Sequence, residues 1–90
     1  MKIKKILIEV SVEEKISKKH GVHRNEIEEG LFEGKPIFFK TKDEKYMAFL
    51  LRGRYISVVF TFTQSVAKVI TAYPSSEWQI RLYKRKRSQK

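Results

Sequence analysis

The chain has 90 residues, which is enough for one modest hydrophobic core and too few for two. Cysteine is absent, which excludes a disulfide framework and a thiolate zinc site, and no apolar stretch is long enough to span a bilayer. Lysine and arginine number 20 against 10 acidic residues, and beyond Leu51 nine basic residues stand against one acidic residue, Glu77. This positive surplus attracts polyanions, and RNA, DNA, an anionic membrane surface or an acidic protein could each be the partner. The basic N-terminus has an apolar run that breaks at Glu9 without a cleavage site, so we expect a cytoplasmic protein.

The first third of the chain predicts a strand and two short helices. Apolar residues alternate along residues 2–10, which is the period of a β-strand. A capping box opening at Ser11 predicts that a first helix starts there, and Gly21 is placed to end it with a left-handed cap. A second helix, rich in glutamate, is predicted from His23 as N-cap to Gly34.

The middle of the chain predicts antiparallel hairpins. Four runs rich in β-branched and aromatic residues follow Pro36, and they read IFFKT, YMAFLL, YISVVFTFT and VAKVITAY. Short turn segments, KDEK, RGR and TQS, separate them without any helical pattern. In the third run Ile56, Val58 and Phe60 point to one face and Ser57 and Val59 to the other. One face of the sheet is therefore predicted to form the core, and the opposite, partly polar face is available to a ligand.

The C-terminal segment predicts a helix that starts at Ser76, with Gln79 placed for a capping box. Trp78 and Leu82 form one apolar patch on it, and residues 84–90 contain no apolar side chain and are expected to fray as a basic tail. These elements predict one α+β domain over residues 1–90. It would be a twisted antiparallel sheet of four to five strands, with two N-terminal helices packed on it and a C-terminal helix.

Several kinds of catalytic site are absent from the sequence. It contains no glycine-rich phosphate loop, no HExxH motif and no nucleophile elbow. His20 and His23 flank Gly21, but no third ligand is near them in sequence. His20 is explained as a residue at the C-terminal end of the first helix, and His23 as the N-cap of the second. We therefore expect neither a metal nor a cofactor.

Cations and phenols are the side chains left for chemistry. RNA cleavage by attack of the 2′-hydroxyl needs a base, stabilisation of the charged phosphorane, and a proton for the leaving oxygen. Fixed arginine and lysine side chains can meet the second need, and Tyr, His or Lys the others. A basic domain that binds RNA without cutting it contains the same residue types, so composition leaves both interpretations open.

Three segments, in order, resemble a known family. KKHGV between the two short helices, KYMAFLLRGRYISVVF as a hairpin, and VITAYPSSEWQIRLYKRKR as strand followed by helix are similar to the BrnT-type toxins. These toxins are members of the wider RelE- and ParE-like group, and the similarity runs from about Val12 to Arg87. The resemblance implies a small α+β ribonuclease toxin that a separately encoded antitoxin holds inactive.

The resemblance also implies roles for individual residues. Lys19 and His20 fall on the family's Lys-His-Gly, Arg54 on the arginine of the hairpin turn, and Arg81 and Tyr83 on the motif of the last helix. The candidate catalytic residues are Lys19, His20, Arg54, Tyr73, Arg81 and Tyr83. In this hypothesis Arg54, Arg81 and Lys19 hold phosphate, while His20, Tyr73 or Tyr83 transfer protons.

Binding residues are expected in the basic C-terminal half. The candidate nucleic-acid-binding residues are Arg52, Arg54, Lys68, Arg81, Lys84, Arg85 and Arg87. Trp78 and Leu82 are the candidate antitoxin-binding residues, because an acidic partner would find both apolar area and basic charge there. DNA binding is expected only through a complex with the antitoxin.

Two positions depart from the family pattern. These toxins usually have arginine where this chain has Tyr73, and glutamate where it has Gln79. A tyrosine cannot replace the charge of an arginine, although it can stack on a base or donate one hydrogen bond. Loss of such an electrostatic group costs on the order of 2.7 to 4 kcal/mol in the transition state. The alternative hypothesis is therefore a catalytically silent module that binds nucleic acid or an antitoxin.

Overall fold

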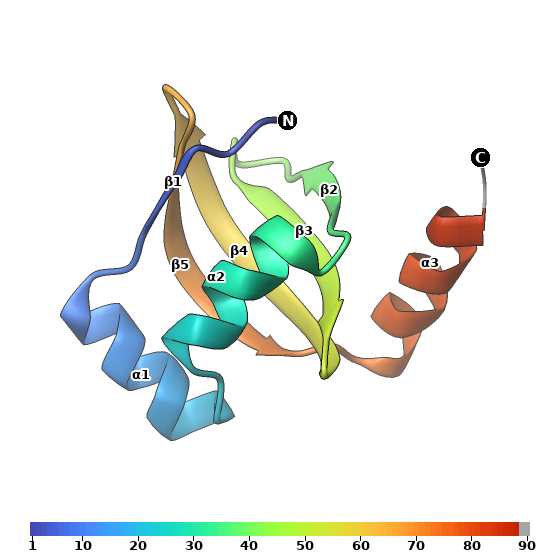
Figure 1. The fold of residues 1–90 in the computed structure, drawn as a ribbon, viewed down its shortest axis with the longest axis horizontal. Coiled ribbons are helices and arrows are strands. Elements are labelled where there is room, and N and C mark those ends of the chain that lie inside the picture. The colour runs from blue at the N-terminus through green and yellow to red at the C-terminus, as the bar shows by residue number, and fades with distance from the viewer. Residues whose placement is uncertain (89–90) are drawn as a thin grey trace.

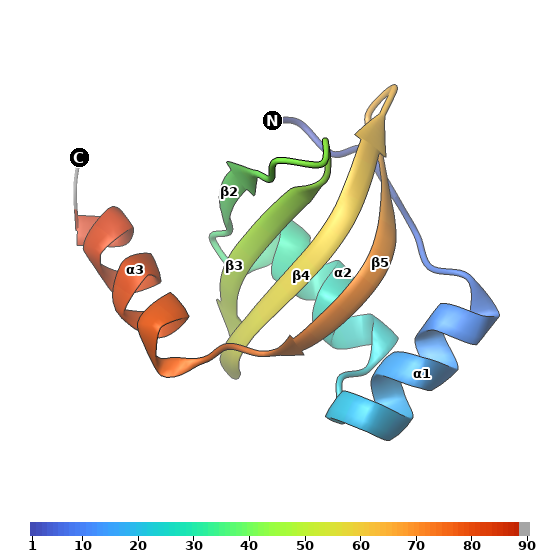
Figure 2. The same ribbon diagram turned by 180° about the vertical axis from the view of Figure 1, so that it is seen from behind.

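A computed structural model describes residues 1–88 as one five-stranded sheet with three helices (Figures 1 and 2). In chain order the elements are β1 (Lys5–Leu7), α1 (Val10–His20), α2 (Arg24–Glu33), β2 (Ile37–Lys40), β3 (Tyr46–Arg52), β4 (Arg54–Thr63), β5 (Val66–Pro74) and α3 (Glu77–Ser88). The strands lie side by side in the order β1-β5-β4-β3-β2. The predicted α+β fold class is confirmed.

The sheet is antiparallel from β2 to β5, as the short turns predict, but β1 pairs with β5 in parallel. Both helices and three strands separate β1 from β5 in the chain, so no hairpin dictates their relative direction. Between Val59 and Phe60 the register of β4 with β5 shifts: Val59 pairs with Thr71 and Phe60 with Val69. Ile70 is therefore left without a partner, which is the arrangement of a β-bulge.

The hydrophobic core lies between the sheet and helices α1 and α2. Ile16 of α1 and Ile27 of α2 are 1% exposed, and they belong to one cluster with Ile56, Val58 and Phe60 of β4, each 0% exposed. In Figure 2 α2 lies behind the sheet, α1 lies beyond β5 at the lower right, and α3 lies on the side of β2 and β3. Burial of large aliphatic side chains on this face supplies most of the drive to fold.

Of the four ends of α1 and α2, three lie where the sequence predicts them. Gly21 adopts φ 66° and ends α1, and its N–H donates to Ser17 O at 3.0 Å. Glu26 accepts from the His23 N–H at 3.0 Å, which caps α2, and α2 ends at Gly34. The predicted start at Ser11 is wrong, because α1 begins at Val10 with Glu9 as its N-cap.

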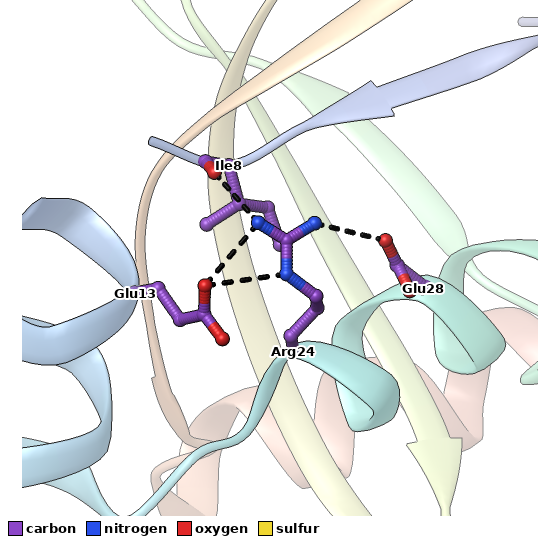
Figure 3. A network of polar contacts seen from close by, with 4 residues as sticks. All are labelled: Ile8, Glu13, Arg24 and Glu28. Carbon is purple, nitrogen blue, oxygen red and sulfur yellow. Dashed lines mark hydrogen bonds and ion pairs between the residues drawn. The ribbon is translucent and has the colours of Figure 1, made fainter. Parts of the chain in front are cut away.

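Arg24 joins the starts of the two N-terminal helices (Figure 3). Its guanidinium donates to Glu13 of α1 at 3.2 Å, to Glu28 of α2 at 3.2 Å, and to Ile8 O beyond β1 at 2.8 Å. Its side chain is 38% exposed, so the ion pairs contribute modestly to stability and mainly set the geometry of the helix pair. These contacts hold the first turn of α1 beside the start of α2.

The C-terminal helix starts as predicted. The Ser76 N–H donates to Gln79 Oε1 at 2.9 Å, which is the capping contact expected at its first turn. The helix continues past Lys84 to Ser88, whereas we expected fraying from Lys84 onward. Lysine and arginine are good helix formers and oppose the negative end of the helix dipole, which accounts for the difference. Residues 89–90 of the expected tail lie outside the described residues.

None of the helices described within residues 1–88 is both long and apolar enough to cross a membrane.

Candidate functional site

Tyr73 is the residue of β5 on which the candidate site is centred, and a β-bulge decides which way it faces. Ala67 and Val69 are buried in the core, so unbroken alternation would turn position 73 to the core as well. The bulge at Ile70 shifts the alternation by one residue, so Ala72 is buried against the core and pairs with Val58. Tyr73 therefore lies on the opposite face, where it is half-buried.

His20 lies beside Tyr73, although 53 positions separate them in the sequence. The centroids of the two rings are 6.0 Å apart, with the ring planes tilted by 54°. His20 is the last residue of α1 and is exposed, and the cap at Gly21 turns the chain immediately after it. The helix end thus brings an imidazole to the edge of the phenol, as the hypothesis of proton transfer requires.

Arg54, at the start of β4, connects this end of the sheet to both N-terminal helices. Its guanidinium donates to the two Glu26 oxygens at 2.9 and 3.0 Å, and to Gly21 O at 2.7 Å. The hydrogen bond from Arg54 lowers the pKa of Glu26, and Glu26 in turn raises the pKa of Arg54. Arg54 therefore stays charged close to His20, but much of its hydrogen-bonding capacity is engaged.

Gln79 of α3 is the other neighbour of Tyr73. It is 4% exposed, and its Nε2 donates to the Tyr73 hydroxyl at 3.1 Å. Ser57 of β4, 0% exposed, donates to Gln79 Oε1 at 2.9 Å, and the Ser57 and Ser75 hydroxyls are 2.8 Å apart. We call His20, Arg54, Tyr73 and Gln79 the sheet-end cluster; it contains three of the candidate catalytic residues.

The other candidate catalytic residues lie in different environments. Lys19 is exposed on the last turn of α1, next to His20 in the chain. Arg81 is exposed on α3 and pairs loosely with Glu77 at 3.5 Å. Tyr83 is 6% exposed, and its hydroxyl donates to Gly34 O at 3.2 Å and Lys35 O at 3.1 Å. Burial raises the pKa of Tyr83, so this phenol anchors α3 and is poorly suited to proton transfer.

The candidate nucleic-acid-binding residues lie on four elements, β3, β4, β5 and α3. Arg52 pairs with Glu29 and Glu33 at 3.2 Å, and Lys68 approaches Glu9 at 3.8 Å on the other side of the sheet. The basic residues of α3 lie together along one helix, where Lys84, Arg85 and Arg87 are exposed. Lys84 Nζ lies 5.7 Å from the ring centroid of Tyr55, a cation–π contact.

Trp78 and Leu82, the candidate partner-binding residues, line a hollow of about 530 Å³ together with Arg81 and Arg85. The Trp78 side chain is 56% exposed and packs edge-on against Phe49, with ring centroids 6.2 Å apart. An apolar floor with two flanking guanidinium groups therefore lies on α3. Among residues 1–88 no group of three or more His, Asp or Glu side chains is placed to hold a metal ion.

Comparison with known proteins identifies the fold. No protein-family model matches the sequence, and no curated protein matches it. A solved structure does match: the 1.1 Å crystal structure of the Brucella abortus ribonuclease toxin BrnT, with a TM-score of 0.67 and 26% sequence identity. The match covers 81% of this chain and 97% of the Brucella chain. The chain therefore shares the fold of this BrnT toxin. The resemblance recognised in the sequence is confirmed.

The two departures from the BrnT-type pattern lie in contact with each other. Tyr73 occupies the position where the resemblance implies arginine, Gln79 the position where it implies glutamate, and they share the 3.1 Å hydrogen bond. A neutral pair thus stands where the pattern would have a charged pair. Gln79 is 4% exposed, so a carboxylate at this position would be buried and would need a partner.

Sequence reasoning missed Glu26 and Ser57 as neighbours of the site. Glu26 accepts from the His23 N–H and so caps α2, and it also holds Arg54. Ser57 is a small polar residue in a strand that is otherwise mostly β-branched and aromatic, and this was the available signal. A buried hydroxyl in such a strand needs a partner, which α3 provides.

Proposed function

We propose that this BrnT-type protein is the toxin of a toxin–antitoxin pair and acts in the cytoplasm as a metal-independent RNA endonuclease. The observation that carries the proposal is the similarity to a ribonuclease toxin over 97% of that toxin's chain. The sheet-end cluster supports it, because the His20 and Tyr73 rings are neighbours there and the Arg54 guanidinium binds the carbonyl of Gly21, the residue after His20.

In the proposed reaction the 2′-hydroxyl attacks the adjacent phosphate, and the 5′-oxygen leaves. His20 accepts the proton of the 2′-hydroxyl and then donates a proton to the leaving 5′-oxygen, while Arg54 and Lys19 stabilise the charge on the phosphorane. Tyr73 donates a hydrogen bond to a phosphate oxygen. Arg81 is exposed on α3 with Lys84, Arg85 and Arg87, so we assign these four residues to binding of the RNA strand.

Cleavage of messenger RNA by the purified protein tests this proposal. Arg54→Ala and His20→Ala should each slow cleavage by at least about a hundredfold if these side chains act in the transition state. Lys42→Ala, which removes an exposed charge from the turn between β2 and β3, is the matched control and should cut at the wild-type rate. No cleavage by the wild type across salt and pH, or equal cleavage by all four proteins, would contradict the proposal.

We also propose an antitoxin as the partner, binding at the hollow of Trp78 and Leu82. Exposed aromatic area beside Arg81 and Arg85 suits an acidic protein segment. DNA would then be bound only through the complex. Trp78→Ala should weaken binding of a protein encoded by the adjacent gene by about tenfold or more. Phe32 is an exposed aromatic residue of α2, and Phe32→Ala should leave this binding unchanged.

A catalytically silent binding module is the second candidate function, and one observation favours it. Arg54 is engaged by Glu26 and by Gly21 O, and Tyr73 carries no positive charge. Expression without any partner separates the two candidates: a silent module leaves growth unaffected but still binds RNA in a salt-sensitive manner.

A further inference from the structure

We propose that Gln79 is a positioning residue that holds the Tyr73 hydroxyl as a hydrogen-bond donor to a phosphate oxygen of bound RNA. This inference rests on the proposed function, in which phosphate is the charged group of the substrate. It concerns the direction of one hydrogen bond. If it holds, Tyr73 acts as a donor and not as a base.

The backbone decides which way the Gln79 amide faces. The Ser76 N–H lies 2.9 Å from Gln79 Oε1, and a backbone N–H can only donate, so this atom must be the amide oxygen. The Ser57 hydroxyl, 2.9 Å away, also donates to the same oxygen. The Gln79 amino group is thereby turned toward Tyr73, and it donates to the phenol oxygen at 3.1 Å.

The direction extends through a chain of hydroxyls. Ser57 has one proton, and it is used on Gln79, so the 2.8 Å contact between the two serine hydroxyls is donated by Ser75. The hydrogen bonds thus run from Ser75 through Ser57 and Gln79 to Tyr73, all in one direction. Bonds aligned in this way polarise one another. Gln79 and Ser57 are 4% and 0% exposed, so water cannot readily reverse the direction of these hydrogen bonds.

Tyr73 is the last residue in this series of hydrogen bonds, and its hydroxyl has one proton to donate. Its oxygen accepts from Gln79, and within residues 1–88 no protein group accepts its proton. The ring is partly exposed and lies 6.0 Å from the His20 ring. A phenol O–H that donates to a phosphate oxygen makes a short, charge-assisted hydrogen bond. The structure therefore presents a prepared donor at the edge of the sheet-end cluster.

The Gln79→Glu variant reverses the last hydrogen bond while keeping the shape of the side chain. A carboxylate can still accept from the Ser76 N–H and from Ser57, so the helix cap remains. It has no proton for Tyr73, so the Tyr73 hydroxyl must turn and donate to Glu at that position. The proton is then no longer available to phosphate.

The first measurement reads the hydrogen bond itself. The infrared C–O stretch of a phenol differs between an accepting and a donating hydroxyl, and subtraction of each protein's Tyr73→Phe counterpart isolates the Tyr73 band. We expect the band to move toward that of a donor to carboxylate in Gln79→Glu. An unchanged band would overturn the assigned direction, whether or not the protein cuts RNA.

The second measurement is the affinity for a single-stranded 2′-O-methyl oligonucleotide, which cannot be cut, followed by fluorescence anisotropy. Gln79→Glu should weaken binding about tenfold when Tyr73 is present and about twofold in the Tyr73→Phe background, where only the added charge acts. If Gln79→Glu weakens binding by the same factor with Tyr73 and with Phe at position 73, the role of Gln79 is structural or electrostatic, and the inference is overturned.

Folding and the proposed function are controlled separately. Circular dichroism melting compares the variants, and Tyr73→Phe alone, which keeps the ring, should still weaken binding about tenfold if the hydroxyl is the donor. If the wild type binds the oligonucleotide but Tyr73→Phe binds equally well, the inference fails and the proposed function stands. If the wild type neither binds nor cuts, both fail.

Discussion

The Arg54 guanidinium holds both oxygens of the Glu26 carboxylate, at 2.9 and 3.0 Å, and so joins the start of β4 to the first turn of α2. The same guanidinium also holds Gly21 O, next to His20. A phosphate that approaches the sheet-end cluster must therefore compete with Glu26 for Arg54. This competition leads to the first prediction.

Glu26→Gln should increase the affinity for a single-stranded RNA by about three- to tenfold, because it removes the charge that competes with phosphate. Fluorescence anisotropy at fixed salt measures it. Glu29→Gln is the matched control, since it removes the same charge from the same helix beside Arg52. If both variants raise the affinity equally, the effect is one of net charge, and Glu26 does not regulate Arg54.

The same ion pair predicts how stability depends on pH. The pKa of Glu26 lies below its ordinary value of 4.5, chiefly because Arg54 donates to it. A lowered carboxylate pKa adds stability that is fully present above pH 4.5 and is lost as the pH falls through the folded-state pKa.

At pH 7 we expect Glu26→Gln to lower the free energy of unfolding by about 1 kcal/mol, the scale of a partly exposed pair. Thermal melts of the wild type and the variant should therefore converge as the pH falls below 4.5. If the difference in melting temperature between wild type and Glu26→Gln stays constant into acid, the ion pair of Glu26 with Arg54 contributes nothing to stability.

Tyr83→Phe should destabilise the protein by about 1 kcal/mol and leave RNA cleavage intact. The change removes a hydroxyl that donates to Gly34 O and Lys35 O, and leaves these carbonyls without that partner. Thermal unfolding and a cleavage assay measure the two effects. Tyr55→Phe, in the neighbouring ring 5.9 Å away, is the control for loss of a phenol. Loss of cleavage at unchanged stability would return Tyr83 to the catalytic residues.

Gly30→Ala should destabilise the fold by about 1 to 3 kcal/mol. A Cβ at Gly30 would lie 2.5 Å from Leu50 Cδ1, inside the core between α2 and β3. Asn25→Ala, at an exposed position of the same helix, provides the control. Urea denaturation measures both, and equal stability of Gly30→Ala and wild type would mean that Leu50 can repack at no cost.

Local sequence signals were sufficient for most of the secondary structure. The hairpins of β2 to β5 follow from apolar runs separated by short turns, and the caps at Gly21, His23 and Ser76 follow from contacts within a few residues. The predicted N-cap of α1, Ser11, lies two residues after the actual N-cap, Glu9, which makes no side-chain capping hydrogen bond and so leaves no local signal.

The candidate site was only partly predictable. His20, Arg54 and Tyr73 were chosen by resemblance, and the fold brings them to one end of the sheet. Tyr83 is also a candidate by resemblance, through the motif of the last helix, but whether its phenol is free or buried depends on how α3 packs, which no local pattern states.

By itself, the sequence determined the elements, the basic C-terminal half and the BrnT-type resemblance, because turns, caps and charge are local properties of the chain. Only the tertiary structure decided that β1 pairs in parallel with β5, that the bulge at Ile70 turns Tyr73 away from the core, and that Gln79 meets Tyr73. Each of these depends on the register or packing of segments that are distant in the chain. A shift of one residue in register exchanges the two faces of a strand, and that shift set the direction of the residue on which the proposed chemistry depends.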